Sequence, residues 1–175
     1  LDYLNNSLSA VLIRKTREDI KDQLPDLITK VVPVPFDVSG AKVYRQITKD
    51  LLTKINDAIG KVGRGFDLWR HYNAMGNEAQ GEIMSRLTVL RMLCDNPDLV
   101  RASADLYASG GGEGSAYAAQ VVNAGWLHSV TKSPKLDAVV EYVRDILEED
   151  KRNKVVVFSF FRQNLRLLDE ALSKF

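Results

Sequence analysis

The most constraining feature of the chain is an apolar run followed at once by an amphipathic helix, in residues 154–175. The run reads Lys-Val-Val-Val-Phe-Ser, so four apolar side chains stand between Lys154 and the hydroxyl of Ser159. A short continuous apolar run is typical of a strand buried on both faces of a parallel sheet. The sequence therefore predicts a strand over 154–159 that carries Ser159 to the carboxyl edge of a sheet.

Composition places the chain among ordinary globular proteins. Of its 175 residues, 45% are hydrophobic and 27% are charged, which is the usual balance for a folded domain. It has no apolar run of the length that spans a bilayer, so we expect no membrane segment. The single cysteine, Cys94, excludes an internal disulfide and indicates a reducing, intracellular setting.

Two stretches in the first half have apolar residues at helical spacing and predict a hairpin of long helices. The first starts with Ser39 as its cap and ends near Ala58, and the second stops before Pro97. Before them, residues 28–38 are rich in β-branched side chains and contain two prolines. This pattern indicates an edge or crossing strand.

The second half predicts a loop and then an α/β unit. Residues 102–131 are rich in small side chains and centre on the glycines at 110–112, which favours a surface loop with one short helix. Ser133 and Pro134 then start a helix that ends near Glu149. Helix, apolar strand and helix in succession are the pattern of an α/β layer. The predicted fold class is therefore mainly α with an α/β portion.

The sequence contains no recognisable catalytic set. His71 and His128 are far apart, whereas a metal site needs closely spaced His or Cys ligands. Cys94 falls on the apolar face of its helix and is interpreted as a core residue. We therefore expect no catalytic residue, cofactor or metal in this chain. Hydroxyl and basic side chains at the ends of elements remain as candidates for phosphate contacts.

Five blocks of the chain, taken in order, resemble the Swi/Snf-type DNA-dependent ATPases of helicase superfamily two. Leu12–Pro25 is similar to the Leu-Arg-Arg-Thr-Lys…Leu-Pro linker of that family, and Val31–Tyr44 to the strand and helix start that follow it. Leu87–Val100 resembles the Leu-Arg-x-x-Cys-Asn-His-Pro block. Ser133–Leu136 resembles the Ser-Gly-Lys-Leu motif that begins the second lobe, and Lys154–Leu172 resembles motif IV with its helix. Together the blocks cover nearly the whole chain.

The resemblance implies three regions of a motor with two RecA-like lobes. Residues 1–38 would be the end of a first-lobe insertion and the interlobe linker. Residues 39–132 would be a helical protrusion with a flexible glycine-rich loop. Residues 133–175 would be the first strand and helices of an incomplete second RecA-like lobe. The parent protein would be an ATP hydrolase that uses ATP and Mg²⁺ to move along double-stranded DNA.

The resemblance also implies roles for individual residues. Ser159 and Arg162 would contact the DNA backbone as part of motif IV, and Lys135 would contact a phosphate or act as a structural clamp. Three basic side chains would brace the linker between the lobes: Arg14, Lys15 and Arg91. The helical protrusion would offer a surface to protein partners.

The chain departs from the family pattern and lacks the family's ATP site. Phe160 stands where the family has glutamine, Asp95 and Asn96 replace Asn-His, and Pro134 replaces glycine. These departures indicate a divergent, viral or bacterial member. The phosphate loop and the Asp-Glu box lie upstream in the family and the arginine finger downstream, so we expect a fragment that does not hydrolyse ATP alone. The alternative is a non-enzymatic helical adaptor, derived from a motor, that binds other proteins.

Overall fold

A computed structural model describes residues 16, 18–23, 27–60, 67–73, 75–110, 112 and 114–173. These residues form seven α-helices and one short 3₁₀-helix, and they contain no strand. The mainly α part of the predicted fold class is thereby confirmed, whereas the described residues contain no α/β portion. None of the helices in the described part is long and apolar enough to cross a membrane. The chain divides into two units, Leu1–Pro33 and Val34–Phe175.

Among its described residues, the first unit contains one short helix with a side-chain cap. The 3₁₀-helix η1 (Glu18–Gln23) follows Thr16, whose amide nitrogen and hydroxyl donate to the Asp19 carboxylate at 2.7 and 2.9 Å. These hydrogen bonds hold the pKa of Asp19 below its ordinary value, the backbone bond most strongly.

The strand predicted at 28–38 is absent from the described residues. The segment 27–37 has no regular secondary structure, and α2 begins at its end. Pro33 and Pro35 have no amide hydrogen, so they cannot donate to a neighbouring strand. A β-branched composition therefore does not produce a strand here.

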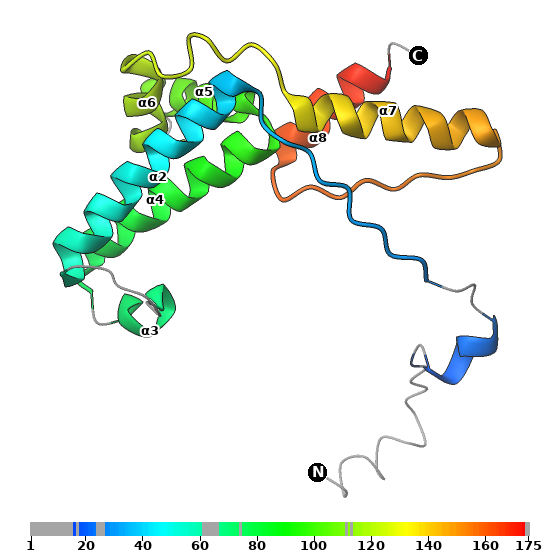
Figure 1. Ribbon diagram of the computed structural model, residues 1–175, viewed down its shortest axis with the longest axis horizontal. Coiled ribbons are helices and arrows are strands. Elements are labelled where there is room, and N and C mark those ends of the chain that lie inside the picture. Colours follow the sequence, from blue (N-terminus) through cyan, green and yellow to red (C-terminus); the bar gives the residue numbers. More distant parts are fainter. Residues whose placement is uncertain are drawn as a thin grey trace, which may run out of the picture. The chain divides into compact units, whose positions relative to one another are not determined.

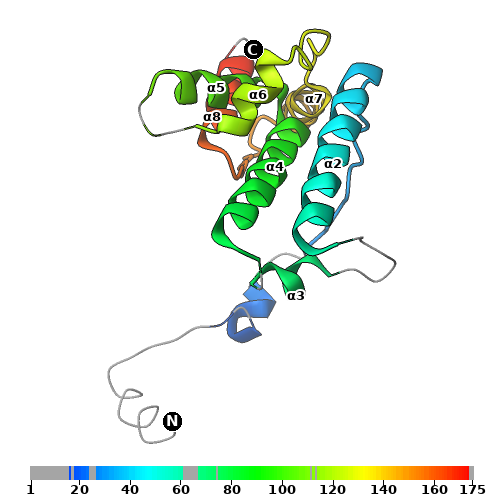
Figure 2. The ribbon, with the colours of Figure 1, turned by 90° about the vertical axis from the view of Figure 1, so that its left-hand side faces the viewer.

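The centre of the second unit is an antiparallel pair of long helices. Helix α2 (Val38–Ile59) and helix α4 (Asn77–Asp95) lie side by side in Figure 1 and in Figure 2, and the short helix α3 (Leu68–Tyr72) lies between them in the chain. The predicted helical hairpin is thus confirmed. Its two apolar stripes face each other and bury eight side chains: Val43, Ile47, Leu51, Ile55, Ile83, Val89, Leu90 and Leu93.

The cap of α2 differs from the prediction. Asp37 and not Ser39 is the N-cap, because its carboxylate accepts hydrogen bonds from the Ser39 hydroxyl and the Gly40 amide, both at 2.7 Å. The two bonds lower the pKa of Asp37, with the Ser39 bond contributing most. An ionised acceptor is stronger than a hydroxyl, so the cap lies two residues earlier than predicted and the helix begins at Val38.

The short helix predicted within residues 102–131 is confirmed, whereas the surface loop predicted there is wrong for residues 102–108, which are helical. Helix α5 (Pro97–Ala108) and helix α6 (Ala116–Asn123) pack against each other and against α4. The small side chains that indicated a loop instead allow the helices to approach closely, and three of them are buried: Ser103, Ala104 and Ala118. The irregular part is a short glycine-rich connection, in which Gly110, Gly112 and Gly114 have positive φ.

The last two helices contact each other beside the end of α4. Helix α7 (Pro134–Glu149) is followed by an extended segment that returns alongside it to helix α8 (Arg162–Leu172), as Figure 1 shows. Three of the predicted site residues belong to this region: Lys135 on α7, Ser159 on the extended segment and Arg162 on α8.

The strand predicted at 154–159 is also absent from the described residues. Its side chains nevertheless alternate, because positions 155, 157, 159 and 161 are half-buried whereas Val156, Phe158 and Phe160 are 73%, 90% and 73% exposed. A strand needs a ladder of hydrogen bonds to a neighbouring strand, and the described residues supply no such neighbour. One face of the apolar run is therefore covered by the helices, and the other face is exposed to solvent.

Candidate nucleic-acid interface

The predicted site is built around the turn between the extended segment and α8. The Ser159 hydroxyl accepts hydrogen bonds from the Phe161 amide at 3.3 Å and from the Asn164 side-chain amide at 3.2 Å. Phe161 is the N-cap of α8 and provides no side-chain acceptor. The first amides of α8 are therefore uncapped by a side chain, and they carry the positive end of the helix dipole.

The structure brings two of the predicted DNA contacts into one cavity. Lys135 and Ser159 line a hollow of about 300 Å³ that also contains Asp95 and Asn164. The Lys135 ammonium forms an ion pair with the Asp95 carboxylate, with 2.5 Å between Nζ and Oδ1. The side-chain oxygen of Asn164 is buried and has no hydrogen-bond partner among the described residues. The cavity thus combines a cation, a hydroxyl and an unused polar atom.

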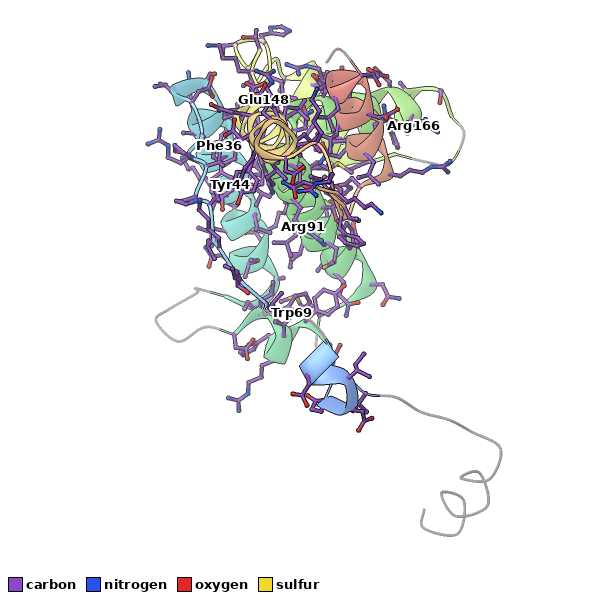
Figure 3. The ribbon with its side chains drawn as sticks, turned by 90° about the vertical axis from the view of Figure 1, so that its right-hand side faces the viewer. Phe36, Tyr44, Trp69, Arg91, Glu148 and Arg166 are labelled. Carbon is purple, nitrogen blue, oxygen red and sulfur yellow. The ribbon has the colours of Figure 1, made fainter. Side chains whose placement is uncertain are left out.

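Arg162 is not in that cavity. It is exposed at the first position of α8 and lines a second hollow of about 330 Å³, together with α5 residues such as Leu99 and Leu106. Arg166 lies one turn further along α8 and is also exposed; Figure 3 labels it beside that helix. Arg166 was not among the predicted site residues, although the i, i+4 spacing from Arg162 places both guanidinium groups on one side of the helix.

Arg91 connects α4 to the turn before α8. Its guanidinium lies 3.8 Å from the ring centre of Phe160 and 6.0 Å from that of Phe161, which is the range of a cation–π contact. Figure 3 shows Arg91 on the same side of the unit as Tyr44 and Trp69, and the three line a groove of about 500 Å³. Arg14 and Lys15, the other residues predicted to brace the lobes, lie outside the described residues.

A buried charged cluster, which no sequence pattern indicated, ties three helices together. Arg86 is 5% exposed and donates to Asp50 of α2 at 2.8 Å and to Glu82 of its own helix at 2.6 Å. Its guanidinium also lies 4.2 Å from the ring centre of Tyr117 on α6. Burial, with a smaller effect of Asp50, raises the pKa of the Tyr117 hydroxyl far above its ordinary value. This cluster has a structural role in the interior of α2, α4 and α6.

Comparison with known proteins gave no match: no protein-family model, curated protein or solved structure is similar to this chain. Within the described ranges, no group of three or more His, Cys, Asp or Glu side chains is placed to hold a metal ion. The function of the chain is therefore inferred from the chemistry of the α7–α8 region and from the sequence blocks.

Proposed function

We propose that this chain is part of an ATP-dependent DNA translocase of the Swi/Snf type, to which it contributes the interlobe linker, the helical protrusion and the motif IV contacts to the DNA backbone. One observation carries the proposal. The turn at Ser159 precedes α8, whose first amides have no side-chain cap. The same turn places the Ser159 hydroxyl in the cavity that Lys135 also lines.

The chemistry of this region suits phosphate and not bases. Amides at a helix N-terminus, hydroxyls and cationic side chains are the usual partners of backbone phosphate oxygens. Arg162 and Arg166 extend the positive surface along α8. Contacts of this kind hold a duplex without reading its sequence, as a motor that moves along DNA requires.

The extended segment fits the start of a second RecA-like lobe. Residues 154–160 alternate between covered and open positions, and Val156, Phe158 and Phe160 are left open. In the proposed parent protein, neighbouring strands of the lobe would cover this face and complete the hydrogen-bond ladder. ATP and Mg²⁺ would bind elsewhere in that parent, so the chain alone would not hydrolyse ATP.

Replacing Arg162 by alanine should weaken binding to double-stranded DNA about fivefold at low salt, equally on unrelated sequences. The slope of log affinity against log salt should become shallower by about 0.9, because one phosphate contact and its released counterion are lost. Fluorescence anisotropy with two duplexes of unrelated sequence measures both quantities.

Arg152→Ala is the matched control for this measurement. It removes the same charge from a side chain that pairs with Asp150 at the other end of the extended segment, and it should change affinity by less than about twofold. A loss that depends on the duplex sequence would contradict backbone contact. A chain without any salt-dependent DNA binding would instead favour the helical adaptor.

A further inference from the structure

We infer that Asp95 competes with a DNA phosphate for the cavity between the first turns of α7 and α8, so that the free protein holds this site closed with its own carboxylate. The inference rests on the proposed function, because the competing anion is a phosphate of double-stranded DNA. It assigns a role to Asp95 in regulating access to Lys135 and Ser159.

The cavity lies where two helices begin. Its lining includes Lys135 and Leu136 from the first turn of α7, and Asn164 and Leu165 from the first turn of α8. Neither helix has a side-chain cap, since Ser133 donates its hydroxyl to the Asp95 carbonyl at 3.4 Å and Phe161 has no polar group. The uncapped start of α7 and the Lys135 ammonium beside one cavity form a positive site that favours an anion.

The ion pair at this cavity joins the end of α4 to the start of α7. Asp95 is the last residue of α4, where a negative charge opposes the helix dipole, and Lys135 is in the first turn of α7, where a positive charge opposes it. Each charge is unfavourable for the dipole of its own helix and favourable for the dipole of the other helix. The Asp95 carboxylate therefore occupies the position that an external anion would take.

The ion pair between Lys135 and Asp95 is weak enough for a DNA phosphate to displace the Asp95 carboxylate. The Lys135 side chain is 51% exposed and that of Asp95 is 19% exposed, so the pair is partly solvated and weak. A duplex offers several phosphates at once, and Arg162 and Arg166 contribute to holding it beside the cavity. When phosphate binds, Lys135 and Ser159 contact it and the Asp95 carboxylate is displaced.

The test is a double-mutant cycle on the full chain, with double-stranded DNA as the probe. Asp95→Asn should raise affinity about fivefold at low salt, because it frees Lys135 and removes a competing charge. In the Lys135→Gln background the same change should raise affinity less than about twofold. Lys135→Arg should restore the full gain, since arginine keeps the charge.

Asp98→Asn controls for the loss of one acidic charge. Asp98 lies in the first turn of α5 and pairs with Arg101, and its replacement should raise affinity less than about twofold. Equal gains from Asp95→Asn with and without Lys135 would overturn the inference while leaving the proposed function intact. A weaker affinity in Asp95→Asn, with circular dichroism showing a folded chain, would also overturn it. Absence of any DNA binding would overturn both.

Discussion

Replacing Arg86 by alanine should lower the free energy of unfolding by about 3 kcal/mol, because the variant loses the packing of a buried side chain and leaves the half-buried Asp50 carboxylate without its partner. Arg86 is buried and bonds to Asp50 and Glu82 at 2.8 and 2.6 Å. The variant also loses the contact with the Tyr117 ring. Urea denaturation followed by circular dichroism measures the change.

The control for this prediction removes an exposed arginine from the same helical pair. Arg45→Ala on α2 loses only a hydrogen bond to the Ala41 carbonyl and should cost less than about 0.5 kcal/mol. Adding Asp50→Asn to Arg86→Ala should restore part of the stability, because the uncompensated carboxylate is gone. A cost for Arg86→Ala no larger than that for Arg45→Ala would show that the cluster does not hold the helices together.

Replacing Gly114 by alanine should cost about 3 kcal/mol of stability, the sum of backbone strain and a steric clash. Gly114 has φ of +89°, and a Cβ there would collide with the Ser103 carbonyl oxygen and the Tyr107 amide nitrogen of α5. Backbone atoms of a helix cannot move aside cheaply, so the connection would lift away from α5. Chemical denaturation measures this loss of stability.

Gly110→Ala is the matched control, because Gly110 has a similar φ of +74° but no atom near the position of a Cβ. It should cost only about 1 kcal/mol, the strain of the left-handed conformation alone. Equal costs at the two positions would contradict the close approach of Gly114 to α5.

Helices with a regular apolar stripe were predictable, and elements that depend on distant partners were not. The stripe of α2 is read directly from Ile47, Leu51 and Ile55. The segment 154–159 has the composition of a strand, but a strand forms only where another strand can pair with it. The small residues of α5 and α6 were misinterpreted as a loop, because small side chains are common both in loops and where helices pack closely.

The candidate site was predictable only where its chemistry is local. Ser159 and Arg162 stand at the junction of an apolar run and a helix, and that junction is visible in the sequence. The pairing of Lys135 with Asp95 spans 40 residues, and no local pattern indicates it. The contact of Arg91 with Phe160 likewise depends on how α4 meets the turn before α8.

The most direct test of the proposed DNA contact is the salt dependence of double-stranded DNA binding by the unaltered chain. The three basic side chains proposed to contact phosphates predict a slope of log affinity against log salt of roughly −3, the same on two duplexes of unrelated sequence. The three are Lys135, Arg162 and Arg166. Affinity that does not change with salt, or that appears on only one duplex, would contradict a backbone-binding motor element.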